Sequence, residues 1–280
     1  MRKLPHWTAA LSVLMFTTSM VANAADMHVK APPPAAPIPP PFNWTGFYIG
    51  ANVGGAWSSG WSSTSNPVPS EEFVGFPPMG FSNSASGVIG GGQIGYNWQF
   101  NRNWLLGVET DFQGAHLQSG STVSPVPLSP TAGGGFALSS SEFMNRELDW
   151  FGTVRARLGI TFDRLLIYGT GGFAYGHVKG SADNTFFAST ILNAGFQAAF
   201  PASNSTTRTG WTAGGGVEYA LPATYGNWTI RGEYLFVSLG GDSVAGVPTP
   251  SAFLPPPTTF QYTWNRTEFH VARFAVNYKF

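Results

Sequence analysis

The C-terminal stretch, residues 267–280, alternates between apolar and polar positions. Counting back from Phe280, every second residue is apolar or aromatic, and this set includes Tyr278, Val276 and Phe274. Successive side chains of a strand point to opposite faces, so one face of this segment is apolar and the other is polar. Alternating segments of about ten residues are typical of transmembrane β-barrels. We therefore predict a closing strand that mediates membrane insertion, with Phe274, Val276, Tyr278 and Phe280 facing lipid and Phe280 at the periplasmic end.

The same pattern recurs in earlier segments of the chain. Together, the predicted strands are residues 46–57, 87–100, 104–117, 149–162, 165–177, 209–221, 228–239 and 267–280. Between them, short turns at 101–103, 163–164 and 222–227 alternate with long loops at 58–86, 118–148, 178–208 and 240–266. Short turns on one side and longer loops on the other are typical of outer-membrane barrels. The sequence therefore predicts an all-β fold: an eight-stranded antiparallel transmembrane β-barrel with short periplasmic turns and four long extracellular loops.

The polar faces of the predicted strands carry acidic and basic side chains in equal number. Glu109 and Asp111 alternate with apolar residues in one strand, and Arg155 and Arg157 do so in the next strand along the chain. The complete set comprises Glu109, Asp111, Arg155, Arg157, Glu218, Arg231, Glu233 and Arg273. An eight-stranded barrel has just enough interior to be filled by side chains. We therefore predict that these residues form a neutral ionic network that plugs the barrel.

Composition narrows the class of protein further. Aromatic residues make up 15% of the chain and charged residues 10%, and 14 basic side chains balance 14 acidic ones. This charge balance predicts no basic patch for nucleic acid. No run of the sequence approaches the 18 or so apolar residues that a membrane helix needs. Aromatic residues are expected to form two girdles, one near the periplasmic ends (Trp44, Phe47, Trp98, Phe100, Trp104, Phe162 and Trp228) and one near the other ends (Trp57, Trp150, Tyr175 and Trp211).

The N-terminus has the features of an exported protein. Arg2 and Lys3 precede an apolar stretch at residues 9–21 and an A-x-A sequence at residues 22–24. This order is typical of a secretory signal peptide, here cleaved after the second alanine. Residues 31–41 are rich in proline and favour an extended polyproline II segment. The predicted domains are therefore a signal peptide at 1–24, a Pro-rich periplasmic linker at 25–43 and a barrel at 44–280. The linker is either a plain tail or a docking segment for a periplasmic partner.

Five stretches of the predicted barrel carry a family resemblance. They are W-T-G-F-Y-I-G-A-N-V-G-G-A-W at 44–57, T-V-R-A-R-L-G-I at 153–160, residues 166–176, G-W-T-A-G-G-G-V-E-Y-A at 210–220 and V-A-R-F-A-V-N-Y-K-F at 271–280. As a set, they resemble the small outer-membrane immunogenic proteins, which are porin-family barrels of alphaproteobacteria. The resemblance implies an OmpA-like eight-stranded fold in the Gram-negative outer membrane and a surface antigen with a role in envelope integrity or host contact. It implies no shared catalytic residues, and it raises haem binding, which some relatives are reported to show.

We therefore expect a structural barrel of the cell outer membrane that makes surface contacts, with no enzymatic activity, no metal and no nucleic-acid partner. The expected partners are outer-membrane lipid and lipopolysaccharide, the outer-membrane assembly machinery through the C-terminal strand, and host or surface ligands through the loops. A monomer or a weak homo-oligomer fits this interpretation. The predicted loops carry more acidic than basic side chains, so they do not favour an anionic ligand.

Two alternatives remain open from the sequence. The first is a narrow pore or a small-ligand barrel, in which His116, His177 or His270 at the predicted extracellular ends would bind haem, although lone histidines there are also ordinary interfacial side chains. The second is a hydrolase of outer-leaflet lipid. In that hypothesis Ser238, His270 and Glu268 meet on the outer wall, with the histidine as base and the glutamate orienting it.

Overall fold

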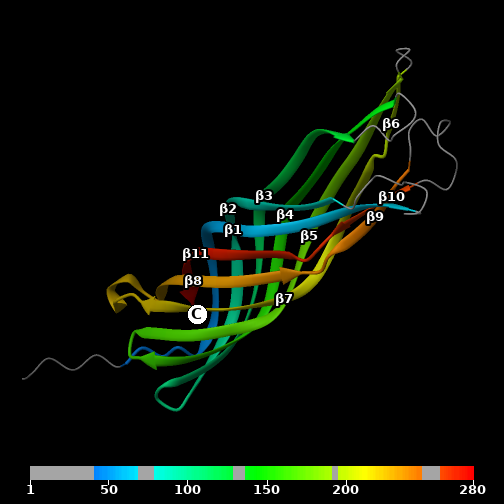
Figure 1. Cartoon of the computed structure of the whole chain (residues 1–280). Helices are drawn as coiled ribbons and strands as arrows, with labels where there is room; N and C mark the ends of the chain where they lie inside the picture. Colours follow the sequence, from blue (N-terminus) through cyan, green and yellow to red (C-terminus); the bar gives the residue numbers. More distant parts are fainter. Residues whose placement is uncertain (1–40, 69–78, 129–135, 191–194, 248–258) are drawn as a thin grey trace, which may run out of the picture. The chain divides into compact units, whose positions relative to one another are not determined.

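The structure, a computed structural model, describes residues 41–68, 79–128, 136–190, 195–247 and 259–280. This part of the chain is almost entirely antiparallel β-sheet (Figure 1). Its elements are β1 (Gly46–Val68), β2 (Met79–Phe100), β3 (Trp104–Leu128), β4 (Phe136–Phe162), β5 (Leu165–Thr190), β6 (Gly195–Ala199), β7 (Ala202–Ala220), the 3-10 turn η1 (Ala223–Tyr225), β8 (Trp228–Leu239), β9 (Asp242–Gly246), β10 (Thr259–Trp264) and β11 (Thr267–Lys279). Among these residues, no helix is long and apolar enough to cross a membrane.

The sheet closes on itself into a ring. The pairing runs from β1 through β2, β3, β4, β5, β7 and β8 to β11, and β11 pairs with β1 again. The closing register runs from Tyr48 opposite Lys279 to Trp57 opposite His270. Each of the eight predicted strand segments lies within one strand of this ring or ends one residue beyond it. Over the length of this pairing the ring has no free strand edge, which is where a sheet is most open to non-native pairing.

The prediction of long loops at 58–86, 118–148, 178–208 and 240–266 is wrong for much of their length. Ring strands continue into these segments, and the short strands β6, β9 and β10 form there as well. Their serine- and glycine-rich composition suggested loops, but the alternation of a strand persists. From Trp61 to Pro67, for example, buried and half-buried positions alternate strictly. Hydroxyl side chains fit the solvated face of a strand. Because these segments are polar on both faces, hydropathy does not show the alternation of inward and outward positions.

The extensions beyond the ring form a second region, here called the head, which comprises residues 61–68, 79–86, 117–128, 136–148, 178–190, 195–208, 242–247 and 259–264. One leaf of the head contains β9, β10 and the extensions of β1 and β2, and the other contains β6 and the extensions of β3, β4, β5 and β7. Register shifts between Ser58 and Trp61, Gly114 and Leu117, and Leu148 and Trp150 mark the passage from ring to head. Such bulges bend a strand and increase its twist.

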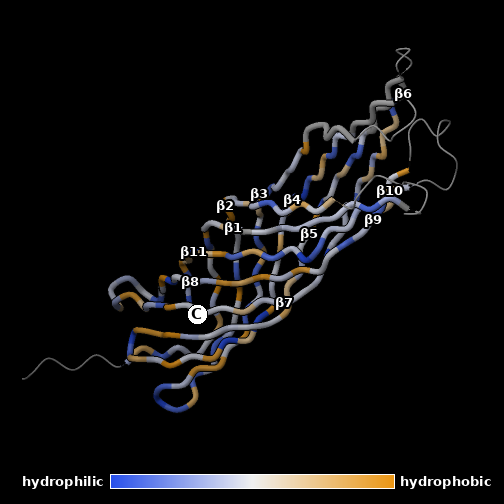
Figure 2. Tube along the Cα trace, viewed as in Figure 1, coloured by the Kyte–Doolittle hydropathy of each residue, from blue (hydrophilic) through white to orange (hydrophobic). Residues whose placement is uncertain are grey.

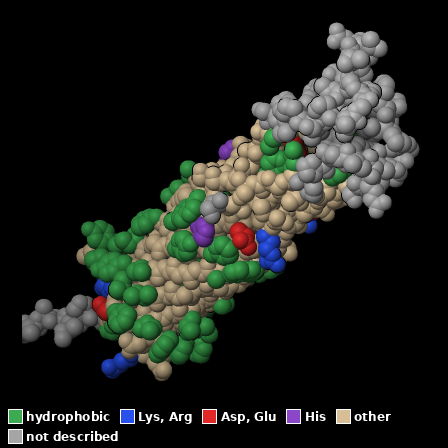
Figure 3. Space-filling model, viewed as in Figure 1, with side chains coloured by type: hydrophobic (Ala, Val, Ile, Leu, Met, Phe, Trp, Pro, Cys, Tyr) green, Lys and Arg blue, Asp and Glu red, His purple; other side chains and the backbone are tan. Residues whose placement is uncertain are grey.

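The outer face of the ring is apolar. Most exposed large hydrophobic side chains lie in the eight ring segments, for example Val88 (71% exposed) and Val108 (60% exposed). Hydropathy changes sharply from residue to residue along the ring strands (Figure 2). Figure 3 shows hydrophobic side chains gathered over one part of the visible surface, with charged side chains and histidines at its borders. We call this surface the apolar belt.

The predicted girdle residues lie at the two ends of the apolar belt, with one exception. Phe47, Trp104, Trp57 and Trp211 are all more than 40% exposed. Trp44 is only 1% exposed and lies in a buried cluster, so its assignment to a girdle is wrong. It precedes β1, and the alternation of strand faces therefore did not apply to it.

Three buried apolar clusters are stacked along the inside. At the end with the short turns lies a cluster of Trp44, Leu105, Leu166, Tyr168 and Ala220. At the other end of the ring lies a larger cluster, the apolar layer, which includes Leu117, Leu148, Phe151, Leu235, Leu239 and Phe269. The head has its own core, which includes Phe81, Met144, Phe200, Phe260, Tyr262 and Trp264. The charged residues of the ring interior lie between the first two clusters.

Candidate functional site in the interior of the ring

Glu109 is the centre of the buried ionic network. Its carboxylate lies 2.5 Å from Nη2 of Arg155 and 2.5 Å from Nη1 of Arg231. Arg157 and Arg273 approach it at 3.5 Å and 3.7 Å. Glu109 is 2% exposed, so these contacts are shielded from water. Ion pairs in such a setting repay their desolvation only when the geometry and the surrounding hydrogen bonds are good.

The remaining acids complete the network. Asp111 accepts from Nη2 of Arg155 at 2.9 Å and from Nη2 of Arg273 at 2.8 Å. Glu233 accepts from Nε of Arg273 at 2.7 Å. On the other side, Nη2 of Arg157 donates to Glu218 at 2.8 Å, and Arg231 faces Glu218 in register across β7 and β8. The structure thus brings together all eight residues predicted for the interior, and their four positive and four negative charges cancel.

Two tyrosines, Tyr48 and Tyr168, belong to the network although the sequence analysis did not name them. The Tyr48 hydroxyl donates to Glu109 at 2.6 Å and accepts from Nη1 of Arg157 at 2.7 Å. The Tyr168 hydroxyl donates to Glu233 at 2.7 Å, and its ring lies 4.0 Å below the Arg157 guanidinium. Both occupy inward positions of their strands, which is the signal that could have identified them.

A glycine makes room for one of these tyrosines. A Cβ added at Gly216 would lie 2.6 Å from the Tyr168 hydroxyl, which is far inside van der Waals contact. β7 therefore needs a residue without a side chain at the position that faces the Tyr168 ring. This explains part of the concentration of glycine in strands, where its propensity is poor.

A chain of amides extends the network toward the turns. Asn52 donates to Gln93 at 2.5 Å, and Gln93 donates to Asn277 at 2.7 Å. Asn277 then donates to Glu218 at 3.0 Å, and the Thr229 hydroxyl also donates to Glu218 at 2.5 Å. These amides are therefore connected to the ionic network through Glu218.

The apolar layer closes the ring above the charges. Phe151 and Phe269 meet edge to face with their ring centroids 5.2 Å apart, and both are 0% exposed. Leu235 and Leu239 come from β8, on the same face as Arg231. The sequence analysis predicted an ionic plug and missed this apolar one. The signal was present, because inward positions change from charged to apolar within single strands.

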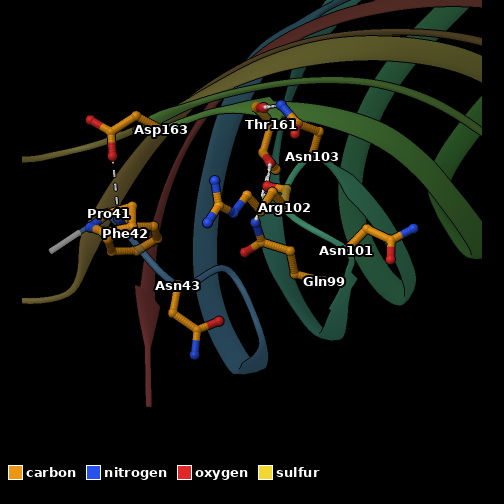
Figure 4. Close-up of a pocket in the computed structure, with 9 residues that line it drawn as sticks. All are labelled: Pro41, Phe42, Asn43, Gln99, Asn101, Arg102, Asn103, Thr161 and Asp163. Atoms are coloured by element: carbon orange, nitrogen blue, oxygen red, sulfur yellow. Dashed lines mark hydrogen bonds between the residues drawn. The ribbon is translucent and has the colours of Figure 1, made fainter.

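The turn end is closed by the residues that precede β1. The Trp44 indole donates to the Asp163 carbonyl at 3.0 Å, and its backbone N–H donates to the Gln99 side chain at 3.0 Å. Outside this closure lies an open cavity of about 680 Å³ (Figure 4). It is lined by polar groups of the turns, such as Arg102 and Asn103, together with Phe42. None of the eight charged residues of the interior lines this cavity.

The three histidines considered as haem ligands lie on separate strands and are not brought together. His116 on β3 is 3.7 Å from Glu147, and its side chain is 74% exposed. His177 on β5 stacks on Trp150 at 5.8 Å, and His270 on β11 stacks on Trp57 at 5.8 Å. Each of these two histidines is the direct cross-strand partner of its tryptophan.

The proposed lipid-hydrolase triad is not formed. Ser238 donates its hydroxyl directly to Glu268 at 3.1 Å, since the two residues are cross-strand partners. His270 instead bonds the Tyr234 hydroxyl through Nδ1 at 2.6 Å. The interpretation failed because the register places His270 opposite Phe236 and leaves the serine no basic partner. Among the described residues, no group of three His, Cys, Asp or Glu side chains is placed to hold a metal ion.

The residues predicted for the closing strand lie on the outer face or at the chain end. Phe274 is 51% and Phe280 71% exposed, and Val276 also faces outward. Tyr278 packs edge to face against Trp228 at 5.1 Å. The backbone N–H of Phe280 donates to the Phe47 carbonyl at 2.9 Å, so the chain end is tied to the start of β1.

The closed ring, the apolar belt and the filled interior define a class of protein, the membrane β-barrels, and comparisons with known proteins specify the family. A family model described as the outer membrane protein beta-barrel domain matches residues 11–280. The 31 kDa outer-membrane immunogenic protein of Brucella melitensis biotype 1 is 39% identical over 273 residues, which cover 95% of each chain. The chain therefore belongs to the outer membrane β-barrel family, and it is a protein of the bacterial outer membrane.

Other relatives are more distant. The 22 kDa outer membrane protein of Rhizobium leguminosarum bv. viciae is 30% identical over 204 residues, which cover 72% of this chain and 67% of that protein. The crystal structure of OprG from Pseudomonas aeruginosa aligns over 84% of this chain and 97% of its own, with 11% identity and a TM-score of 0.38. The predicted resemblance to alphaproteobacterial outer-membrane immunogenic barrels is thus confirmed by the sequence relatives. The predicted signal peptide and residues 25–40 of the linker lie outside the described residues and stay predictions.

Proposed function

We propose that this protein is a closed eight-stranded transmembrane barrel with a structural role, which holds a rigid β-sheet head at the cell surface and contributes to envelope integrity and surface contact. One observation carries the proposal: among the described residues, buried side chains occupy the interior of the ring from the turn end to the head. The Trp44 cluster, the ionic network and the apolar layer follow one another along the ring. An interior packed in this way offers no continuous path for water, so the barrel serves to anchor the head.

In this proposal the short turns face the periplasm and the head faces the outside. The C-terminus lies at the same end as the short turns, and the head lies at the other (Figure 1). Outer-membrane barrels have short periplasmic turns and longer extracellular segments. The apolar belt would contact outer-membrane lipid and lipopolysaccharide, the C-terminal strand would be read by the assembly machinery, and the head would meet host or environmental ligands. Nothing in this arrangement requires more than a monomer or a weak homo-oligomer.

Conductance measurements on purified protein in planar lipid bilayers test the filled interior. We expect no steady current, because both the charges and the apolar layer block water. The informative variants are Glu109→Gln and Arg155→Gln, and the matched control is Glu147→Gln on the outside of the head. A steady conductance in the wild type that shifts in the two interior variants but not in the control would replace the structural proposal with a pore.

Protease treatment of intact cells tests the orientation. Cuts are expected only within residues 58–86, 118–148, 178–208 and 240–266. Any cut in intact cells at 101–103 or 163–164 would reverse the assignment of sides. A haem titration that gives a Soret shift lost in His177→Ala or His270→Ala would instead support the ligand-binding alternative.

A further inference from the structure

A shallow, open cavity of about 330 Å³ lies on the outer wall of the head, next to the apolar belt. Sites for small molecules have volumes of about 300–1,000 Å³, so this cavity has room for a small organic group. Adjacent strands β4, β5 and β7 supply its lining, which consists of Asn145, Glu147, Lys179, Gly180, Ser181, Ser203, Asn204 and Ser205. Among the described residues, no apolar side chain takes part in this lining.

The strand register arranges six of these side chains in two rows on the outer face. The row nearer the ring is Glu147, Lys179 and Ser205, and the row farther from it is Asn145, Ser181 and Ser203. Neighbouring strands lie about 4.7–4.9 Å apart, and two residues along a strand span about 6.6 Å. Hydrogen-bonding groups therefore repeat at intervals close to the width of one sugar ring.

The height of the two rows relative to the membrane limits what can reach them. His177 stacks on Trp150 at 5.8 Å at the upper border of the apolar belt, and such aromatic residues mark the membrane interface. Along β5, Lys179 and Ser181 lie two and four residues beyond His177, which is about 7 and 13 Å along the strand and roughly 5 and 10 Å along the membrane normal for a strand tilt of about 40°. The headgroup layer of a phospholipid bilayer adds only about 5–7 Å on each side of its hydrocarbon core. The farther row is therefore beyond a phospholipid headgroup, but a lipid with a saccharide headgroup reaches it.

The charges at the cavity do not favour an anionic ligand. Lys179 is already paired with Asp149, with Nζ 2.7 Å from the carboxylate. Glu147 accepts a hydrogen bond from Gln118 at 3.0 Å, on the side of β3. One ammonium and two carboxylates leave a net charge of −1 here, which repels a phosphate group. The other groups of the lining are hydroxyls and amides, which both donate and accept hydrogen bonds as neutral sugar hydroxyls do.

An exposed aromatic ring lies beside the farther row. Phe143 is the next outward residue of β4 beyond Asn145, and it is 41% exposed. Its cross-strand neighbours are the polar residues Thr122 and Asp183. Sugars have an apolar C–H face that packs on aromatic rings and hydroxyl groups that hydrogen-bond to polar side chains. Water fits the hydroxyl and amide groups alone, whereas a saccharide fits those groups and the phenylalanine together.

We propose that this cavity binds the saccharide headgroup of an outer-leaflet glycolipid whose acyl chains lie on the apolar belt. The inference rests on the proposed orientation, in which the head faces outward. One sugar ring would lie across the two rows, with its hydroxyls bonded to Asn145, Lys179 and Ser203 and its C–H face toward Phe143. A glycolipid held at both ends in this way would bind more tightly than a lipid that contacts the apolar belt alone. The site would therefore select lipopolysaccharide from the lipids around the barrel.

Binding of purified lipids to the full protein in detergent tests this site. The probes are lipopolysaccharide with a core oligosaccharide and phosphatidylglycerol, and native mass spectrometry gives the Kd of each. Ser181→Trp fills the cavity from an outward position and should weaken lipopolysaccharide binding by about tenfold or more. Ser84→Trp, the same change on the outer face of the other leaf, is the control and should bind like the wild type. Phosphatidylglycerol should bind all three proteins equally, because its headgroup does not reach the farther row.

Phe143→Ala separates recognition of the sugar from simple blocking of the cavity. It should weaken lipopolysaccharide binding by about threefold to tenfold and leave phosphatidylglycerol binding unchanged. Equal lipopolysaccharide affinities of wild type, Ser181→Trp and Phe143→Ala would overturn the proposal. An equal loss of phosphatidylglycerol binding in Ser181→Trp would do the same, because the site would then not recognise the sugar. Protease mapping on intact cells measures the orientation independently, so unchanged affinities in a protein with the proposed orientation would refute this site and leave the structural role intact.

Discussion

Six strands, β1 to β5 and β7, run from the ring into the head, yet the apolar residues lie on opposite faces in the two regions. In the ring portion of β4, Val154 and Leu158 point outward and are each 51% exposed, while Arg155 is buried inside. In the head portion of the same strand, Met144 is buried inside and Asn145 faces outward. Both stretches are antiparallel strand, and the bulge between Leu148 and Trp150 shifts the inward positions from even to odd residue numbers. What changes is the medium outside the strand, and this decides which face carries the apolar residues.

The two regions are therefore stabilised by different forces. The head lies outside the apolar belt and buries an apolar core between its leaves. This burial stabilises the head by about 25 cal/mol per Å² of apolar surface removed from water. The ring exposes its apolar side chains to lipid, so its interior cohesion comes from paired charges and from a closed ladder of backbone hydrogen bonds. Substitutions of the same kind should consequently have opposite effects in the two regions.

The largest effect is expected from Glu109→Gln in the ring. This change leaves four neighbouring arginines with one negative charge fewer, and removing one partner of a buried ion pair costs about 3–5 kcal/mol. Urea unfolding of the protein in lipid vesicles, followed by tryptophan fluorescence, measures the loss. The control Glu147→Gln, on the outside of the head, should change the free energy of unfolding by less than about 0.5 kcal/mol. Equal stabilities of the two variants would refute a central role for Glu109.

The corresponding substitution in the core of the head is Phe260→Ala. Phe260 is 2% exposed in the head core, and truncating a buried phenylalanine costs about 3–5 kcal/mol. Only the head should loosen, so trypsin sensitivity of the head should rise while the ring keeps its resistance to heat in detergent. Phe143→Ala, at an exposed position of the head, is the control and should leave both properties unchanged. Joint unfolding of ring and head would show that they form one cooperative unit.

A pair of arginine substitutions tests the inversion itself. Val154→Arg places a charge on the apolar belt near mid-strand and should cost about 2–4 kcal/mol. Ser141→Arg, on the outer side of the head portion of β4, should cost less than about 0.5 kcal/mol. Unfolding of both variants in the same vesicles gives the comparison. A penalty at Ser141 as large as that at Val154 would contradict the assigned boundary of the membrane.

The smallest effect is expected from pH, and it should be confined to the head. Glu142 is 1% exposed in the head, and burial raises its pKa from about 4.5 to about 7, while Ser65 acts in the opposite direction. Below about pH 4.5, the Glu142 carboxyl is neutral in both the folded and the unfolded chain. Above the higher value the folded head must bury a charge, so its stability falls as pH rises, by about 1–3 kcal/mol in total. Proteolysis of the head at pH 5 and pH 8 measures this difference, and Glu142→Gln should remove it.

Much of the ring could be predicted because apolar and charged residues alternate along its strands. Val154, Arg155, Ala156 and Arg157 alternate without exception, and the ionic network follows from the same alternation. The head was missed because Ser, Thr and Asn occupy both faces of its strands for long stretches. The apolar layer was missed for a different reason. Leu235 shares the inward face of Arg231 and Glu233, but the interior was expected to be charged, so apolar residues were assigned to the lipid-facing side.

The sequence by itself determined the alternation, the balance of interior charges and the family to which the chain belongs, because each of these is a property of residue order alone. Only the tertiary structure decided which acid meets which arginine, that Ser238 bonds Glu268 and leaves His270 to Tyr234, and that Asn145 and Ser203 line one cavity. These outcomes depend on the register between strands that are distant in sequence. A shift of one residue turns every side chain of a strand to the opposite face.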